Sequence, residues 1–305
     1  MNAIEKELLK QIADLHKIPS GAFSLRVNGK GESLNSTTEI EIEQKTDKPG
    51  INIYVKPNVK GKSMHIPAII TTGGVNDVVY NDFYIGENAE VTIVAGCGIH
   101  NNSSEDSKHN GIHSFHLSKG SQVTYLEKHL ALGEGSGEKI LNPVTNINLD
   151  ENSTLIMDTT QVSGVTSSVR KTNAKLLDNA KLIIKEKVLT TNSQIATTEF
   201  NVDLVGKDSS IDIVSRSVAQ DNSYQNFYSC INGKNKCFGH VACDGILTDQ
   251  ARIDSTPKIV CENVDATLVH EAAIGKIAGE QLIKLTTLGL TEQEAEDLII
   301  KGFLK

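Results

Sequence analysis

The residues best suited to metal chemistry gather in the last quarter of the sequence. The adjacent pair His270-Glu271 offers an imidazole and a carboxylate, and four of the five cysteines precede it: Cys230, Cys237, Cys243 and Cys261. Imidazole, carboxylate and thiolate groups are all potential metal ligands. The cysteines are separated by six, five and seventeen residues, which does not match the C-x2–4-C spacing of common zinc sites. An inert buried thiol is the alternative for each cysteine.

The fifth cysteine, Cys97, lies between two glycines in the stretch "AGCGIH". Small neighbours would leave its sulfur accessible, and a reactive thiol needs access. The stretch that follows it is rich in histidine and contains His100, His109, His113 and His116 together with Asp106. We interpret that stretch as a polar, solvated insertion between two strands.

Most standard catalytic signatures are missing. The chain has no G-x-x-x-x-G-K-[ST] phosphate loop, and "GEGSGEK" (133–139) is expected to be a flexible loop. It also has no G-x-S-x-G elbow, and His270-Glu271 lacks the second histidine of a zinc-protease motif. The chain should therefore not bind ATP through a phosphate loop, and a zinc-protease interpretation fails.

Composition argues against several partners and locations. The net charge is −8, from 30 basic and 38 acidic residues, whereas nucleic-acid binding proteins usually present a basic face. Tryptophan is absent and aromatic residues total 4%, which disfavours stacking on sugars or single-stranded nucleic acid. No apolar run reaches the roughly 18–20 residues that span a bilayer, and the first twenty residues lack a secretory apolar core. We therefore expect a cytoplasmic protein with free thiols and no membrane span.

A repeated sequence pattern predicts the elements that position these residues. A strand, a turn rich in Gly, Asn and Asp, a small residue and a second strand recur from about residue 80, as in "FYIGENAEVTI" (83–93) and "FHLSKGSQVTY" (115–125). The small residues are Ala89, Ser121, Ser153, Ala180, Ser209 and Ala251, at gaps of 32, 32, 27, 29 and 42 residues. Stacked repeats of this length that are nearly all strand predict a mainly β fold, a parallel β-helix or similar β-solenoid.

Helices are expected at both ends of the β-helix. Apolar residues at helical spacing predict a helix over 3–16, within an N-terminal segment 1–20. The β-helix core is assigned to 21–265 and a helical segment to 266–305. That segment contains one helix over 278–289, closed by a glycine, and a second that starts at a Thr291–Glu294 capping box. A helical pair this short cannot build its own core, so it must dock on the β-helix or on a partner.

Three stretches carry a resemblance to a known family. They are "SRSVAQDNSYQNF", "CFGHVACDGILTDQARIDSTPKI" and "HEAAIGKIAGEQLIKLTTLGLTEQEAEDLIIKGF". The chain resembles the SufB/SufD family, the scaffold subunits of the SUF iron–sulfur assembly machinery, strongly over 210–305 and more weakly over 65–210. The "HEA" at residue 270 makes it more similar to SufB than to SufD, in a short form.

The resemblance implies a right-handed parallel β-helix whose C-terminal helices dock on SufC, an ABC-type ATPase. It assigns cluster assembly to Cys243, Glu271 and His270, and sulfur acceptance to Cys97. Cys237 and Cys261 are candidate additional ligands. The residues expected to bind the ATPase are Leu282, Leu285, Leu298 and Phe303.

The implied function is a scaffold that accepts sulfur and iron and builds a transient iron–sulfur cluster near a dimer interface. The resemblance implies no enzyme in the usual sense, because ATP hydrolysis belongs to the partner subunit. The second subunit is either another copy or a SufD-like paralogue, and sulfur would come from a donor such as a cysteine desulfurase system. Use of a reduced flavin stays open, as does the role of Cys230. The alternative is a β-helix carbohydrate-active enzyme of the polysaccharide lyase or esterase type.

Overall fold

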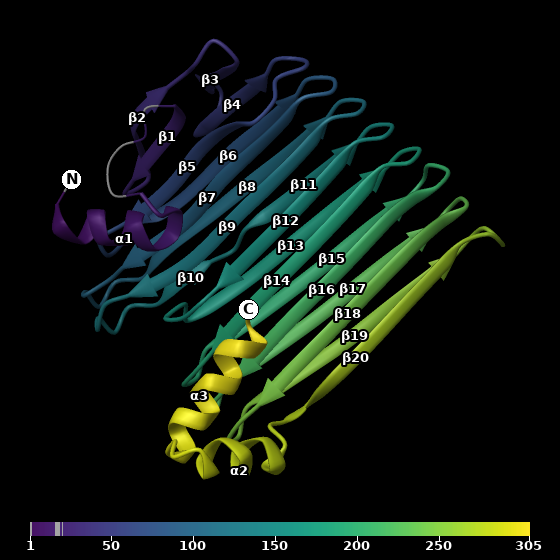
Figure 1. The fold of residues 1–305 in the computed structure, drawn as a ribbon. Helices are drawn as coiled ribbons and strands as arrows, with labels where there is room; N and C mark the ends of the chain where they lie inside the picture. The colour runs from purple at the N-terminus through teal and green to yellow at the C-terminus, as the bar shows by residue number, and fades with distance from the viewer. Residues whose placement is uncertain (1, 16–18, 20) are drawn as a thin grey trace.

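The predicted β-solenoid is confirmed. The computed structural model describes residues 2–15, 19 and 21–305. Its strands wind through about eight turns and form two ten-stranded sheets, here called sheet A and sheet B (Figure 1). Beyond the antiparallel pairs β1–β2 and β3–β4 at the first end, the strands of each sheet pair in parallel with the strands one turn before and one turn after them.

Sheet A runs, in spatial order, through β2 (Lys30–Asn35), β1 (Ala22–Val27), β5 (Lys62–Ile70), β7 (Glu90–His100), β9 (Gln122–Leu132), β12 (Thr154–Gln161), β14 (Lys181–Thr190), β16 (Ser209–Ala219), β18 (Cys237–Leu247) and β20 (Thr267–Lys276). Sheet B runs through β19 (Arg252–Cys261), β17 (Tyr224–Gly233), β15 (Ile195–Leu204), β13 (Ser167–Leu176), β10 (Lys139–Leu141) with β11 (Val144–Leu149), β8 (Ser107–Leu117), β6 (Asn76–Ile85), β4 (Gly50–Val55) and β3 (Ile40–Gln44). The helices are α1 (Ala3–Ala13), α2 (Gly279–Thr287) and α3 (Glu292–Phe303).

Alternation along each strand builds the interior. Every second side chain points between the sheets, and the others face outward. Aliphatic and aromatic residues fill one long side of the interior, where the Phe83 and Phe115 rings stack with centroids 4.4 Å apart. A polar set lies nearer the carboxyl ends of the sheet A strands and includes Glu127, Glu186 and Ser215. The interior is therefore apolar along one side and polar along the other.

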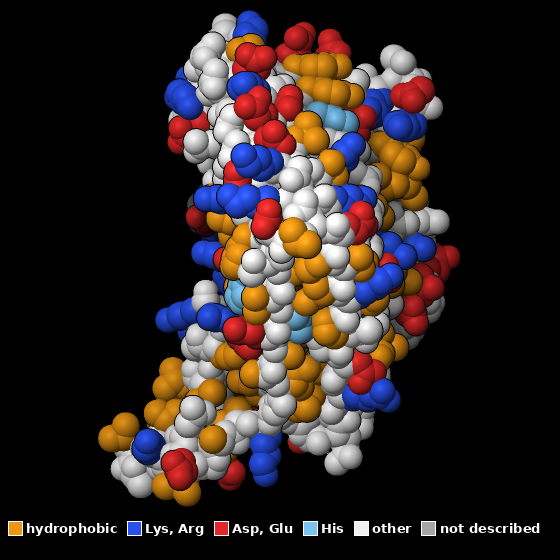
Figure 2. Space-filling model, turned by 90° about the vertical axis from the view of Figure 1, so that its right-hand side faces the viewer, with side chains coloured by type: hydrophobic (Ala, Val, Ile, Leu, Met, Phe, Trp, Pro, Cys, Tyr) orange, Lys and Arg blue, Asp and Glu red, His pale blue; other side chains and the backbone are white. Residues whose placement is uncertain are grey.

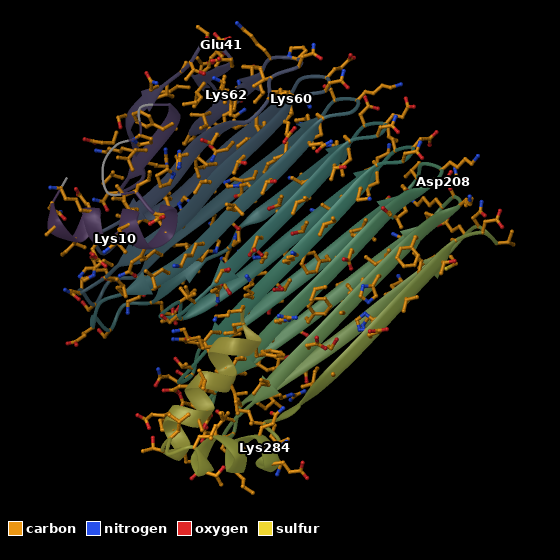
Figure 3. All side chains as sticks on the ribbon, in the orientation of Figure 1. Lys10, Glu41, Lys60, Lys62, Asp208 and Lys284 are labelled. Carbon is orange, nitrogen blue, oxygen red and sulfur yellow. The ribbon has the colours of Figure 1, made fainter. Side chains whose placement is uncertain are left out.

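The corners of the solenoid, where the polypeptide turns from one sheet to the other, explain the repeated sequence pattern. A residue with positive φ turns the chain and a fully buried small residue follows it, as at Asn88–Ala89 and Asp208–Ser209. Asn and Asp tolerate this left-handed conformation, and a small side chain fits the tight corner. Figure 3 labels Asp208 on this long edge of the molecule. The gaps of 32, 32, 27 and 29 residues are therefore single turns of the solenoid.

The assignment of Ala251 to this series is wrong. Ladder pairing places Cys237 beside Ser209, whereas Ala251 precedes β19 in sheet B, one turn after Ser223. The opposite corner also uses left-handed residues, such as Asp221 and Asp249. Since both corners use the same turn chemistry, a sequence pattern alone does not tell them apart.

The β-solenoid continues beyond residue 265, where we expected it to end. Strand β20 pairs with β18 over its whole length, so 267–276 is a final strand rather than part of the helical segment. The helical tail begins at Gly279 and follows the predicted caps: Gly289 has φ +96°, and Thr291 and Glu294 form the capping box. Its helices lie beside the carboxyl ends of the last sheet A strands (Figure 1).

Helix α1 packs on the outer face of sheet A. It ends at Ala13, before the predicted residue 16, because Asp14 adopts a left-handed conformation. Residues 16–18 and 20 lie outside the described part of the chain. Ile12 and Leu8 lie against Gly96 and Gly98, where side chains would collide with the helix. The glycines beside Cys97 thus accommodate α1.

Candidate functional site

Cys97 points into the solenoid rather than toward solvent. Its side chain is 2% exposed, and its ladder neighbour on the next turn is His129. Burial, with the nearby Asp77 and Glu127 carboxylates, raises the pKa of the Cys97 thiol well above its ordinary range. The accessibility expected from the flanking glycines is therefore wrong, because the open side of those glycines is covered by α1.

A cavity gives Cys97 its surroundings. A space of about 240 Å³ lies between the first turns of the two sheets. Cys97, His109, His113, Glu127 and His129 are among its lining residues, together with residues of β1, β2, β5, β6 and the β3–β4 connection. The thiol therefore lies in a polar internal cavity near the N-terminal end of the solenoid.

The histidine-rich stretch is also interior, contrary to the solvated insertion we expected. Residues 107–117 form β8, and alternation turns His109 and His113 inward while His116 faces outward. His109 Nδ1 lies 3.0 Å from Asp77 Oδ2, and His113 Nδ1 lies 2.9 Å from the Tyr125 hydroxyl. Burial lowers the pKa of His113 to about 4. Both histidines belong to the cavity wall.

A chain of polar contacts leads away from this cavity. The Tyr125 hydroxyl donates to Glu127 Oε1 at 2.8 Å, and Arg170 Nη1 donates to Glu127 Oε2 at 2.6 Å. Arg170 Nε lies 3.6 Å from Glu186 Oε1 on the other side. Burial opposes ionisation of Glu127, but Arg170, His129 and other neighbours together hold its pKa well below the usual range. One buried guanidinium thus bridges two buried carboxylates.

The same series of polar contacts extends to the solenoid turn that precedes the one containing Cys243. Thr198 and Ser215 donate hydrogen bonds to Glu186 at 3.0 and 2.8 Å. Ser215 is the ladder neighbour of Cys243, which is fully buried and faces inward. Burial raises the pKa of the Cys243 thiol to about 11, although the adjacent Ser255 favours the thiolate. The inward column Glu127, Thr159, Glu186, Ser215 and Cys243 is therefore polar in each of its five strands.

The final strand separates the predicted partners of Cys243. His270 pairs with Val241 and faces inward, which puts its Cα about 8 Å from that of Cys243, one strand across and two residues along. Both nitrogens of His270 are buried without a hydrogen-bond partner among the described residues. Glu271 faces the outer side, because side chains alternate, and its carboxylate lies 3.8 Å from His240 Nε2.

The remaining cysteines lie elsewhere. Cys237 and Cys243 are six residues apart on β18, a separation of about 20 Å. Cys237 is instead near Cys261: it contacts the space beside Gly233, and Gly233 is the ladder neighbour of Cys261. Cys261 is exposed and Cys230 is buried on the outer side of β17. The structure does not bring any of these thiols to Cys243.

The described side chains do not form a preassembled metal site. Within residues 2–15, 19 and 21–305, no group of three or more His, Cys, Asp or Glu side chains is arranged to hold a metal ion. Over the same residues, none of the helices combines the length and the apolar character that crossing a bilayer requires.

Sequence reasoning missed the polar interior. Taken singly, Glu127, Arg170 and Glu186 look like ordinary strand residues. Their signal in the sequence is a polar residue at an inward position of the strand, where its neighbours two residues away are apolar. Glu186 follows the inward Ile184 by two residues, and Glu127 follows Tyr125 in the same way. The signal appears only after the turns are aligned, because one charged residue in one strand is unremarkable.

The helical tail uses its apolar residues in two ways. Leu282 and Phe303 pack against the outer face of sheet A around Val218, and Leu285 is half-buried. Leu298 is 51% exposed, and it is joined on the surface by Ile283 at 63% and Leu288 at 81%. Hydrophobic side chains gather on this projecting segment at the lower left of Figure 2, and Figure 3 labels Lys284 on α2 there.

Comparison with known proteins matches most of the sequence to a family. Residues 78–303 match the family model described as the SUF system FeS cluster assembly, SufBD core domain. A curated SufBD family protein of Methanothermobacter thermautotrophicus is 29% identical over 233 residues, which cover 75% of this chain and 56% of the relative. Against that protein, the chain spans little more than half of the relative's length.

Two other archaeal relatives match along nearly their whole length. An iron–sulfur cluster assembly SufBD family protein of Methanocaldococcus jannaschii is 25% identical over 321 positions, covering 98% of both chains. One from Pyrococcus horikoshii is 27% identical over 318 positions, covering 98% of this chain and 94% of the relative. With its β-solenoid, its paired C-terminal helices and a family match over most of its length, the chain belongs to the SufBD family of iron–sulfur cluster assembly proteins.

Proposed function

We propose that this chain is a scaffold on which an iron–sulfur cluster is built at Cys243 with sulfur received at Cys97. The observation that carries the proposal is the polar interior, which joins the Cys97 cavity to the turn containing Cys243. A solenoid needs only apolar side chains inside for stability, and unpaired buried charge is costly. Charges retained along this one route therefore favour a role in transfer.

The two cysteines are too far apart for direct exchange. Five strand spacings separate β7 from β18 in sheet A, or about 24 Å. The Cys97 thiol would attack the outer sulfur of a donor persulfide and give up its proton to the departing donor thiolate, which leaves the donor thiol and a Cys97 persulfide. Two equivalents of a thiol reductant would then restore the Cys97 thiol and yield one disulfide and one molecule of hydrogen sulfide. Sulfide, small enough to pass between side chains, would travel to Cys243.

A second subunit would complete the iron site. Cys243 and His270 face inward and Glu271 faces outward, but all three lie on or beside β20, the last strand of sheet A in the described residues. Val269 and Ile274 of this strand and Ile259 of β19 are exposed apolar residues. Packing of another copy or a SufD-like chain against β19 and β20 would cover them and add ligands to the same place.

The tail would dock an ABC-type ATPase, which would carry the energy-consuming step. Ile283, Leu288 and Leu298 form an exposed apolar surface on helices that are themselves anchored to the solenoid through Phe303. Substituting these three exposed residues by serine should abolish capture of the ATPase without unfolding the protein. Lys284→Ala, which changes the neighbour of Ile283 on α2, serves as the control and should leave capture of the ATPase intact.

Anaerobic reconstitution tests the assignment of the cysteines. With ferrous iron and free sulfide, Cys243→Ala should form no cluster absorption band, whereas Cys97→Ala should form one normally. With a persulfide-bearing protein donor and a thiol reductant, Cys243→Ala should again form no cluster, whereas Cys97→Ala should form one only slowly, from the sulfide that the reductant releases directly from the donor. Cys237→Ala, another inward cysteine of β18, is the matched control and should behave as the parent. A parental cluster spectrum from Cys243→Ala would overturn the proposal.

A further inference from the structure

A column of stacked rings runs along the outer face of sheet B. Tyr54 of β4, Tyr84 of β6 and His116 of β8 occupy the same outward position in successive strands. The Tyr54 and Tyr84 centroids are 5.1 Å apart with an angle of 11° between the planes, and the Tyr84 and His116 centroids are 4.9 Å apart with an angle of 9°. The column thus repeats one ring per strand, at the spacing of the strands themselves.

The column ends above a short side chain. Asn148 of β11 is the next residue in this outward position, and Lys175 of β13 follows it. Two strand spacings, about 9.6 Å, separate the backbone of His116 from that of Lys175. A flat ring in van der Waals contact on both faces needs about 7–8 Å between its neighbours. The gap over Asn148 therefore has the thickness of one ring.

A surface hollow lies at this position. Its volume is about 350 Å³, within the range of small-ligand sites, and its lining includes Tyr84, His116, Asn148, Asp150, Lys175 and Leu177. The ring of His116 forms one wall, and Lys175 and Leu177 belong to the strand and corner beyond the gap. The Asn148 amide provides hydrogen-bond donors and an acceptor, Asp150 provides an acceptor and Lys175 a positive charge.

We propose that this hollow binds a planar heteroaromatic ring, stacked on His116 where a fourth ring of the column would lie. Asn148 and Asp150 would recognise the polar edge of the ring, and Lys175 would favour an attached anionic group. Adenine nucleotides and flavin nucleotides share this chemistry. The site is separate from the proposed assembly route, because its side chains face outward from sheet B and the route lies between the sheets.

Binding to the full-length protein tests the proposal. Flavin mononucleotide is followed by the quenching of its fluorescence, which stacking on an aromatic ring produces, and adenosine monophosphate by calorimetry. We expect saturable binding of at least one probe. Binding of the flavin alone would identify a flavin site, binding of the adenine nucleotide alone a nucleotide site, and equal binding a site that reads ring shape.

Two variants locate the site. Asn148→Phe should weaken binding at least tenfold, because the new ring fills the gap and continues the column. His116→Ala should weaken binding by removing the stacking wall. Asn201→Phe, an outward substitution two strands farther along the same face, is the matched control and should bind like the parent. Thermal unfolding verifies that each variant is folded. Failure of both probes to bind at 1 mM (on the order of the weakest useful affinities), or unchanged binding by Asn148→Phe, would overturn the proposal.

Discussion

The two ends of the solenoid hold the same kind of residue in opposite settings. At the first end, Cys97 lies in an internal cavity beneath antiparallel edge strands and a covering helix. At the last end, Cys243 is equally buried, but the strands beyond it carry exposed apolar side chains and a histidine without hydrogen-bond partners among the described residues. The first end is complete within one chain, whereas the last end offers groups that a second chain could complete.

The difference shows that fold and function place separate demands on the same repeat. The corners and the aliphatic side of the interior recur along the solenoid and satisfy the fold, and the Phe83–Phe115 stack adds to them between two neighbouring turns. The polar side does not follow the repeat and changes from turn to turn, from Glu127 through Arg170 to Ser215. Where a regular architecture departs from its own pattern in a connected series, the departure indicates function.

The largest effect is expected at the centre of the polar chain. Arg170→Ala removes the guanidinium between Glu127 and Glu186 and leaves buried carboxylates without their partner. Such a loss costs about 3–5 kcal/mol of unfolding free energy. Lys171→Ala, the next residue, breaks only the exposed pair with Glu199 and should cost less than about 1 kcal/mol. Urea unfolding of the two variants measures the difference, and equal losses would contradict the importance of the interior pair.

Acid should weaken the first end through His113. Burial lowers the pKa of His113 from 6.5 to about 4. Between these two pH values the unfolded protein therefore binds a proton at His113 and the folded protein does not. The corresponding stability is present above pH 6.5 and is lost as the pH falls toward 4, by up to roughly 3 kcal/mol. Urea titrations between pH 7 and pH 4 should show this slope, and His113→Gln should reduce it. An undiminished slope in the variant would assign the effect to other groups.

Substitutions at two glycines test the difference between the first end of the solenoid, which α1 covers, and the last strand, β20. A methyl group at Gly96 would lie 2.9 Å from the Ile12 carbonyl oxygen of α1 and 2.8 Å from that of Lys128, so Gly96→Ala should cost about 1–3 kcal/mol. Gly275, on β20, has no atom within 4 Å of the same position. Gly275→Ala should therefore change the unfolding free energy by less than about 0.5 kcal/mol. A similar cost at both positions would mean that the last strand is covered in the isolated protein.

The smallest effect is a difference in thiol reactivity that leaves stability unchanged. Cys261 is exposed, whereas the other four cysteines are buried and the pKa values of Cys97 and Cys243 are raised. Alkylation of the native protein at about pH 7.5, roughly one unit below the pKa of an ordinary thiol, followed by mass spectrometry, should label Cys261 first and the others only slowly. Rapid labelling of Cys97 would show that its cavity opens to reagents.

Much of the architecture could be predicted from the sequence because it depends on local chemistry. The corners with left-handed residues, the capping box of α3 and the end of α2 at Gly289 each depend on a few adjacent residues. The site was less predictable because it depends on which turns are neighbours. The contact between Glu127 and Arg170 joins residues 43 positions apart, and Glu271 faces away from His270 only because both lie on a strand.

The most direct test of the central claim blocks the polar route between the two cysteines. Thr159 lies in the polar column between Glu127 and Glu186, and its hydroxyl is buried without a partner among the described side chains. Thr159→Leu fills that place, and Thr160→Leu, on the outward side of the same strand, is its control. With a persulfide-bearing donor, we predict that cluster formation slows at least tenfold in Thr159→Leu alone, while free sulfide restores the parental rate. An unaltered rate from the protein donor in a folded Thr159→Leu variant would contradict transfer through the interior.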